Sequence, residues 1–145
     1  MACNLEKGGR LALFVELEAA KGRVRLLRMV AAFDCGAVLN PDNLRNQATG
    51  AMAMGIGGAL FKELRYDRRK VLSASFSAYR VPRFSDMPPI EVILVNRSDQ
   101  APAGAGESPI TVVAPAIAAP LFKVTNRRLR ALPLEGGLED EDHRG

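Results

Sequence analysis

Glu107 is the side chain in this sequence best suited to acid–base chemistry. It lies in the segment Gly104-Ala105-Gly106-Glu107-Ser108-Pro109, whose two glycines let the backbone pass close to a bulky group. Ser108 is a suitable N-cap and Pro109 suits a first helical position, so Glu107 is expected just before a helix N-terminus. A carboxylate held there, facing a partly dry cavity, is a candidate general base. The alternative is a favourable charge–dipole contact without a chemical role.

Other reactive side chains are few. The two cysteines, Cys3 and Cys35, are too few for the four thiolates of an iron–sulfur cluster or for a Cys-rich zinc site. We expect free buried thiols rather than a disulfide. The single histidine, His143, lies in a polar tail, which argues against a Ser-His-Asp or Cys-His mechanism.

Charge is unevenly distributed along the chain. The net charge is +4, but residues 135–145 hold five acidic residues and one arginine, which leaves 19 basic and 11 acidic residues in the rest. Such a basic body suits nucleic acid or an anionic cofactor, or it is a solvated surface. A small RNA- or polyanion-binding module is therefore an alternative function. Aromatic residues make up only 6% of the chain and are not interleaved with the basic ones, which argues against it.

The length of 145 residues predicts one domain. The first ten residues lack the apolar core of a signal peptide. The longest strongly apolar stretch covers residues 51–60, well below the roughly 18 residues that span a bilayer, so we expect no membrane span.

Alternating patterns predict strands over residues 9–18 and 23–33, joined by the turn signal Lys21-Gly22 into an antiparallel hairpin. Residues 64–72 look like a charged hairpin edge, residues 90–95 like a short strand, and residues 128–134 like a last short strand. Residues 98–108 form a loop rich in Gly, Ala and Pro. We expect a mobile tail over residues 135–145.

Two helices are predicted. The first is capped by Asn40, starts at Pro41 and runs to Glu63. Its four glycines indicate close approach of a ligand or backbone, or tight packing on a sheet. The run Gly55-Ile56-Gly57-Gly58-Ala59-Leu60 is not a dinucleotide fingerprint, because Leu60 replaces the third glycine inside a helix. The second helix starts at Pro109, and its prolines, Pro115 and Pro120, predict a kink or an irregular first turn.

Several segments, in order, resemble the C-terminal cofactor-binding domain of the xanthine dehydrogenase and aldehyde oxidase family, and most of all its isoquinoline 1-oxidoreductase beta-subunit branch. The resemblance covers residues 4–134. The segments that carry it are Glu6-Lys7-Gly8-Gly9, Phe33-Asp34-Cys35-Gly36-Ala37-Val38-Leu39-Asn40-Pro41, Asn46-Gln47, Gly58-Ala59-Leu60, Tyr79-Arg80-Val81-Pro82-Arg83-Phe84-Ser85-Asp86, Ile90-Glu91-Val92, Gly104-Ala105-Gly106-Glu107 and Leu132-Pro133-Leu134. The chain departs from the family at Asn46, Thr49 and Pro120.

The resemblance implies an α+β fold of antiparallel hairpins packed with the glycine-rich helix and a C-terminal helix. Residues 1–134 would be the C-terminal segment of a molybdenum-cofactor-binding domain. It implies hydroxylation of an aldehyde or N-heteroaromatic carbon with oxygen from water, with Glu107 as the base near molybdenum. Gln47 would contact the pterin, and Gly106 and Ala105 would pass beside the metal, which the pterin dithiolene holds instead of protein ligands. The expected cofactor is molybdopterin, as the cytosine dinucleotide.

The resemblance also implies partners. The family subunit is several times longer, so we expect this chain to need the rest of the large subunit, and to be inactive and without cofactor alone. A small subunit carrying 2Fe-2S clusters would accept the electrons, and nucleic acid is not an expected partner. A non-catalytic remnant that only pairs with other subunits is a third possibility. The first strand should lack native neighbours and leave an exposed sheet edge, and any export signal would lie upstream.

Overall fold

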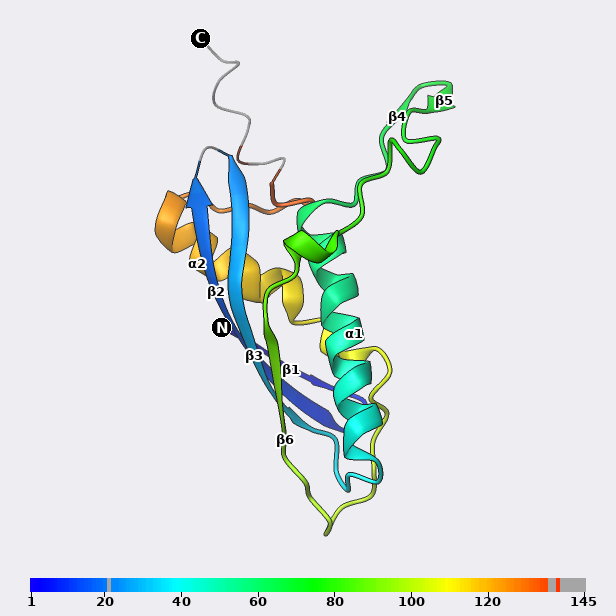
Figure 1. The fold of residues 1–145 in the computed structure, drawn as a ribbon, viewed down its shortest axis with the longest axis vertical. Helices are drawn as coiled ribbons and strands as arrows, with labels where there is room; N and C mark the ends of the chain where they lie inside the picture. Colours follow the sequence, from blue (N-terminus) through cyan, green and yellow to red (C-terminus); the bar gives the residue numbers. More distant parts are fainter. Residues whose placement is uncertain (21, 136–137, 139–145) are drawn as a thin grey trace.

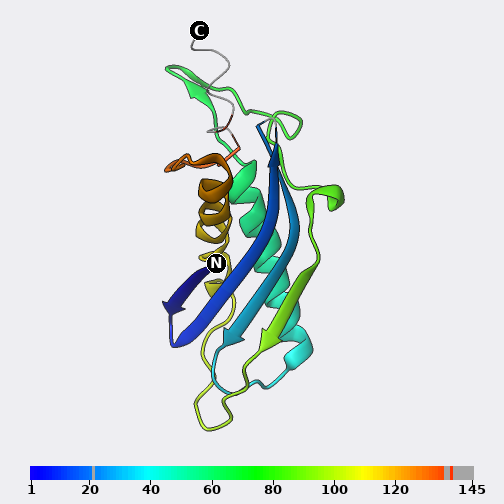
Figure 2. The ribbon, with the colours of Figure 1, turned by 90° about the vertical axis from the view of Figure 1, so that its left-hand side faces the viewer.

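The structure is a computed structural model that describes residues 1–20, 22–135 and 138. One four-stranded sheet carries both long helices on the same face (Figure 1, Figure 2). The strands, in sheet order, are β1 (Ala2–Glu6), β2 (Gly9–Ala20), β3 (Arg23–Asp34) and β6 (Ile90–Leu94). The helices are α1 (Pro41–Leu60) and α2 (Val113–Thr125). The predicted α+β class is confirmed.

The central hairpin of β2 and β3 is antiparallel, as predicted. Its buried side chains alternate with exposed ones because successive residues of a strand point to opposite faces. The buried set faces the helices and consists of Leu11, Leu13, Val15, Met29, Ala31 and Phe33. The predicted strand near residue 90 is β6, which pairs with β3 in parallel, with Met29 opposite Ile90. This parallel pair needs a crossover, which α1 and the segment after it supply.

The expectation that the first hairpin strand lacks a neighbour is wrong. The short strand β1 pairs antiparallel with β2, from Ala2 opposite Leu13 to Glu6 opposite Gly9. The sequence pattern concealed this strand because two of its three half-buried positions, Asn4 and Glu6, are polar. The edges of the sheet are therefore β1 and β6.

Helix α1 begins as predicted and ends earlier than predicted. The Asn40 side chain accepts a hydrogen bond from the Asn43 N–H at 3.0 Å, and Pro41 occupies the first turn. The helix ends at Leu60 instead of residue 63, because the N–H groups of Phe61 and Lys62 both donate to the Gly57 carbonyl and close the last turn.

The second helical segment starts irregularly, as predicted. A short 3-10 helix, η2 (Ser108–Ile110), precedes α2, which continues through Pro120. The predicted N-cap role of Ser108 is wrong. Its hydroxyl is buried without a hydrogen-bond partner, and its carbonyl accepts from both the N–H and the hydroxyl of Thr111. Ser108 lies inside the 3-10 turn, so its side chain does not reach the first N–H groups of α2.

Residues 108–125 are long and apolar enough to cross a membrane by length and composition, with a mean hydropathy of 1.4. Six of their apolar side chains are nevertheless buried in the core. They are Pro109, Val112, Val113, Ala116, Ile117 and Leu121. This pattern is that of a helix covering a sheet, as α2 covers β2 (Figure 2).

The predicted charged hairpin is present as β4 (Tyr66–Asp67) and β5 (Lys70–Val71), which pair antiparallel. Residues 64–79, which include β4 and β5, stand away from the body as an extended arm (Figure 1), and Arg80 returns to the body at the Phe61 ring. Seven large hydrophobic side chains between residues 62 and 84 are exposed, and Phe76 and Phe84 are completely so. The seven are Leu64, Tyr66, Val71, Leu72, Phe76, Val81 and Phe84.

The predicted strand over residues 128–134 is wrong. The Leu134 N–H donates to the Ala59 carbonyl at 2.7 Å, so the segment crosses the end of α1 and does not join the sheet. Pro133 has no N–H to donate to a neighbouring strand, so the segment does not form a strand despite its apolar residues. Of the expected tail, Glu135 is well anchored, and residues 136–137 and 139–145 lie outside the described residues.

Candidate functional site

The loop that carries Glu107 is fastened to the connection between β3 and α1. The Ala103 N–H donates to the Cys35 carbonyl at 2.7 Å, and the Ala37 N–H donates to the Gln100 carbonyl at 3.2 Å. Gly36 has φ +82°, and a Cβ there would lie 2.2 Å from the Ala101 carbonyl oxygen. Only glycine therefore allows the loop to pass so closely under the start of α1.

An ion-pair network secures the beginning of the same loop. The Arg97 guanidinium donates twice to Asp99 at 3.3 Å and lies 3.8 Å from Asp34. The hydrogen bonds from Arg97 hold the pKa of the exposed Asp99 carboxyl below its ordinary value. Burial, and then the neighbouring Asp34 charge, raises the pKa of the Cys35 thiol, which keeps this sulfur protonated at neutral pH.

The turn between β1 and β2 contacts the other end of the loop. Lys7 forms an ion pair with Glu107, and the Asn4 amide donates to the Thr111 hydroxyl at 2.7 Å. A Cβ built at Gly8 would lie 3.4 Å from the Ala103 Cβ. The position of this turn depends on β1, a strand that the sequence pattern concealed. The contact of Lys7 with Glu107 was therefore not predicted.

Within the described chain, the carboxylate of Glu107 is 67% exposed and the Lys7 side chain is 56% exposed. Glu107 precedes η2 and makes no capping hydrogen bond through its side chain. Gly106 is exposed and Ala105 is half-buried. A Cβ built at Gly104 or Gly106 would meet nothing within 4 Å. The three predicted loop residues thus share one open surface.

Gln47 lies on an open face of α1. Gln47, Gly50, Met54 and Gly58 are spaced by three, seven and eleven residues from the first, so they share one side of the helix. Gln47, Gly50 and Met54 are exposed, and a Cβ at Gly50 or Gly58 would meet nothing within 4 Å. The helix therefore presents an amide beside two positions without side chains.

The other two helical glycines have a packing role. A Cβ built at Gly55 would lie 2.7 Å from Val113 Cγ2 and 3.2 Å from Ile110, and one at Gly57 would lie 2.9 Å from Pro82. Gly55 thereby brings the segment just after Glu107 against α1. No hydrogen bond joins Gln47 directly to Glu107 among the residues that the structure describes.

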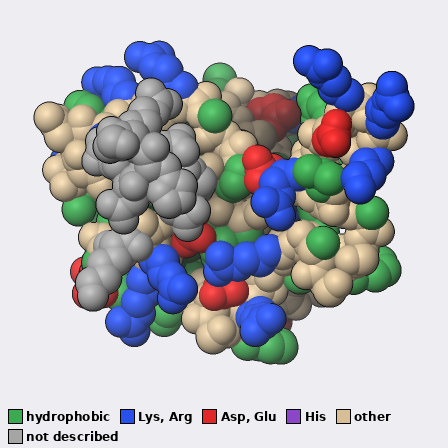
Figure 3. All heavy atoms as spheres, turned by 90° about the horizontal axis from the view of Figure 1, so that it is seen from above, with side chains coloured by type: hydrophobic (Ala, Val, Ile, Leu, Met, Phe, Trp, Pro, Cys, Tyr) green, Lys and Arg blue, Asp and Glu red, His purple; other side chains and the backbone are tan. Residues whose placement is uncertain are grey.

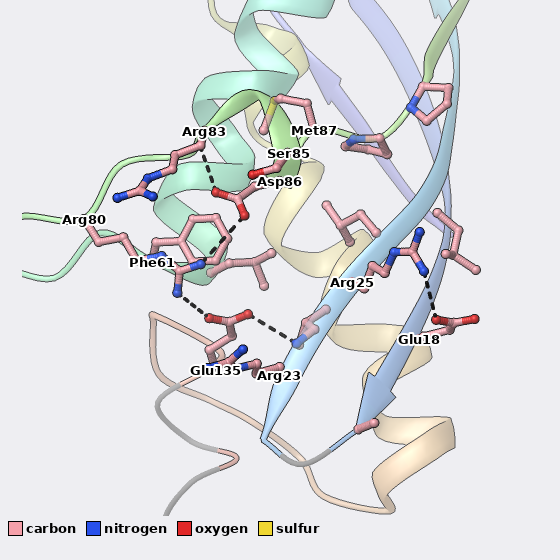
Figure 4. A pocket seen from close by; sticks show the side chains of 17 residues that line it. Glu18, Arg23, Arg25, Phe61, Arg80, Arg83, Ser85, Asp86, Met87 and Glu135 are labelled. Carbon is pink, nitrogen blue, oxygen red and sulfur yellow. Dashed lines mark hydrogen bonds and ion pairs between the residues drawn. The ribbon is translucent and has the colours of Figure 1, made fainter.

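A groove of about 900 Å³ lies at the other end of the molecule, between β3, the end of α1 and the short helix η1 (Phe84–Asp86) (Figure 4). Arg80 crosses it, with its guanidinium 3.8 Å from the centre of the Phe61 ring. The same guanidinium pairs with Glu135 at 3.1 Å and Asp86 at 3.9 Å. The segment around Arg80 was identified in the sequence through the family resemblance, but this groove was not predicted.

Glu135 closes the groove from the C-terminal side. Its carboxylate accepts from the Val24 N–H at 3.2 Å as well as from Arg80, and its side chain is only 13% exposed. Arginines and carboxylates interleave over this end of the molecule (Figure 3). The arrangement joins the C-terminal segment to β3 and to α1, which is a structural brace. The described residues contain no cluster of three or more His, Cys, Asp or Glu side chains that could hold a metal ion.

Comparison with known proteins places the chain in a family. Residues 9–88 match the family model of the molybdopterin cofactor-binding domain. The aldehyde oxidoreductase molybdenum-binding subunit PaoC of Escherichia coli is 37% identical over 130 residues, which cover 83% of this chain and 18% of that protein. The isoquinoline 1-oxidoreductase subunit beta of Brevundimonas diminuta is 30% identical, covering 86% of this chain and 16% of that one.

Solved structures agree with this assignment. The aldehyde oxidoreductase of Desulfovibrio desulfuricans superposes with a TM-score of 0.78 at 26% identity, covering 90% of this chain and 15% of that one. The chain thus spans less than a fifth of the length of these relatives. From the sheet, the two helices and these matches together, the chain belongs to the molybdopterin cofactor-binding family of the xanthine dehydrogenase and aldehyde oxidoreductase molybdenum-binding subunits.

Proposed function

We propose that this chain is part of a molybdenum hydroxylase that oxidises an aldehyde or an N-heteroaromatic carbon with oxygen taken from water. The observation that carries the proposal is the exposed carboxylate of Glu107 on a glycine-flanked loop fastened beside the start of α1. Relatives named for aldehyde and isoquinoline oxidation support the choice of substrate classes. Electron-poor carbon centres are common to both classes.

The surface formed by the chain fits a large polar cofactor. The Gln47 amide is exposed and can both donate to and accept from a pterin edge. Gly50 and Gly58 on the same face, and Gly104 and Gly106 on the loop, leave open space where side chains would stand. The buried Ser108 hydroxyl, next to Glu107, has no hydrogen-bond partner within the described chain. The open positions on the helix and the loop are features that a ligand or neighbouring polypeptide would fill.

The residues have separate roles in the proposed reaction. Molybdopterin, as the cytosine dinucleotide, supplies the two-electron redox chemistry when bound, and the protein supplies position and proton transfer. Gln47 would hold the pterin edge, and the backbone at Ala105 and Gly106 would pass along the bound cofactor. Glu107 Oε accepts the proton of the water-derived nucleophile.

The proposed partners are the rest of the large subunit and a small subunit with 2Fe-2S clusters. The arm supports this, because it exposes several large hydrophobic side chains, and exposed apolar patches are typical of a surface that a protein covers. The open face of α1 also supports these partners, as does the outer face of the sheet, where Phe14 and Ile93 are exposed. We expect this chain alone neither to retain the cofactor nor to turn over substrate.

The test uses the complete subunit assembled with its partners and supplied with an aldehyde or an N-heterocycle in isotopically labelled water. We expect the product to carry the water label and the preparation to contain molybdenum and pterin. Label arriving from dioxygen, or turnover that persists without molybdenum, would contradict the proposal. The 145-residue chain, assayed in parallel, should be inactive.

A further inference from the structure

The loop around Glu107 does little to fix its own carboxylate. Gly104 and Gly106 give the backbone a wide choice of conformations, and neither position has neighbours that would restrict a side chain. Glu107 makes no capping hydrogen bond to η2. A base must be held within a fraction of an ångström of its productive position, so another element has to orient it.

The turn between β1 and β2 is that element. The turn and the strand before it reach the segment from Ala103 to Thr111. Lys7 pairs with Glu107, Asn4 of β1 donates to Thr111, and a Cβ built at Gly8 would meet the Ala103 Cβ at 3.4 Å. Lys7 has φ +50°, a backbone conformation that glycine adopts more readily than lysine. The turn therefore carries a long cationic side chain at a position where its backbone alone would favour glycine.

We propose that Lys7 is a positioning residue for Glu107, and that the turn between β1 and β2 clamps the loop so that this carboxylate stays aimed at the reacting centre. The inference rests on the proposed function for its catalytic consequence only. The clamp itself is a property of the chain. Both side chains of the pair are more than half exposed, so the pair adds little to stability and its role is orientation.

The clamp is tested first by hydrogen exchange on the 145-residue chain. Lys7→Met should speed exchange of the hydrogen-bonded amides at the two ends of the loop, those of Ala103, Ile110 and Thr111, by about two- to fivefold, the change expected for losing one exposed ion pair. Lys7→Arg should restore protection. Arg10→Met is the matched control, because it removes an equal charge from the same hairpin without touching Glu107. Unchanged exchange in Lys7→Met, or equal acceleration in Arg10→Met, would overturn the clamp.

The catalytic consequence is tested in the complete assembled enzyme. Lys7→Met should lower kcat about tenfold or more with KM within about twofold, since misplacing a reacting group by an ångström costs up to about 10²-fold. Lys7→Arg should recover most of the loss, and Arg10→Met should retain full kcat. A loosened loop with unchanged kcat would overturn the positioning role.

The two proposals fail in different ways. If Glu107→Gln abolishes turnover while Lys7→Met changes neither exchange nor kcat, Lys7 has no positioning role and the proposed function stands. If Lys7→Met loosens the loop but Glu107→Gln turns over normally, the clamp exists and the role of Glu107 as base is wrong.

Discussion

Gly55 of α1 lies directly against Val113 of α2, so that a Cβ at Gly55 would come within 2.7 Å of Val113 Cγ2. Val113 is itself completely buried and cannot move away easily. This contact sets how close the two helices approach. It therefore also sets where η2, and Glu107 just before it, meet α1.

The first prediction follows from this contact. Gly55→Ala should destabilise the chain by about 1–2 kcal/mol, because overpacking a core costs about 1–3 kcal/mol and alanine returns up to about 1 kcal/mol of helix propensity. Gly50→Ala is the matched control on the open face, and it should stabilise the isolated chain by up to about 1 kcal/mol. Urea denaturation measures both. Equal effects at the two glycines would contradict the packing described here.

The open face of α1 leads to a second prediction for Gly50→Ala, which concerns cofactor content. In the complete enzyme, Gly50→Ala should lower molybdenum and pterin content although it stabilises the isolated chain, because its methyl group would stand beside Gln47 on the surface proposed to meet the cofactor. Metal analysis and pterin fluorescence after denaturation measure this. Full cofactor content would show that this face meets nothing closely.

The brace between Arg80 and Glu135 should contribute to stability. Glu135 is nearly buried and accepts hydrogen bonds from Val24 and Arg80, so Glu135→Ala leaves the Val24 N–H without its acceptor. We expect a loss of about 1–3 kcal/mol, or a melting temperature lower by a few degrees. Arg69→Met, which removes an exposed arginine of the arm, is the control and should change little. Similar melting temperatures for both variants would contradict the brace.

The sequence predicts those features of the structure that neighbouring residues determine, and it fails where contacts between distant segments decide. The hairpin of β2 and β3 and the Asn40 cap are local patterns, and both are confirmed. Strand β1 was missed because polar residues fill two of its three half-buried positions. The predicted end of α1 was wrong because the Phe61 and Lys62 N–H groups close the last turn on the Gly57 carbonyl. The predicted strand over residues 128–134 was wrong because the Leu134 N–H donates to the Ala59 carbonyl, a contact between distant segments.

In the candidate site, too, residue types could be recognised in the sequence, whereas contacts between distant segments could not. The residue types of Gln47, Ala105, Gly106 and Glu107 pointed to a pterin and a base through their resemblance to a family, and their roles stay predictions. The contact of Lys7 with Glu107 depends on the pairing of β1 and β2, which no spacing in the sequence indicated. The groove at Arg80 joins three segments that are distant in sequence, so only the fold reveals it.

The two thiols should differ in reactivity. Cys3 is exposed, whereas Cys35 is buried, and burial followed by the Asp34 charge raises the pKa of Cys35 above its ordinary value of 9.0. At pH 8 a maleimide should therefore label Cys3 quickly and Cys35 only as the protein opens. Mass spectrometry of timed samples measures the two rates. Comparable rates would contradict the burial of Cys35.

The raised pKa of Cys35 also determines how this thiol makes stability depend on pH. Because the folded-state pKa of Cys35 is raised, its protonated form favours the native state, and this contribution is full below the ordinary thiol pKa of 9.0. It is lost as the pH rises through the folded-state value. Cys35→Ala should therefore flatten the decline in stability above pH 9, which thermal denaturation at several alkaline pH values measures.

The arm over residues 64–79 should matter for assembly and not for folding. Phe76 is completely exposed, so Phe76→Ser should change the stability of the chain by no more than about 0.5 kcal/mol. We expect it to reduce the yield of assembled enzyme on co-expression. Leu39→Ser, an exposed position outside the arm, is the control. Equal yields from both variants would remove the arm from the interface.

The role of Glu107 is measured most directly by comparing Glu107→Gln with Glu16→Gln in the complete enzyme, at equal molybdenum and pterin content. Glu16 is an exposed glutamate of β2 and serves as the control. We predict that kcat/KM falls by about 10²–10⁴-fold in Glu107→Gln, the range for loss of a general base, and stays unchanged in Glu16→Gln. A fully loaded Glu107→Gln enzyme that turns over at the rate of the unsubstituted protein would contradict this account.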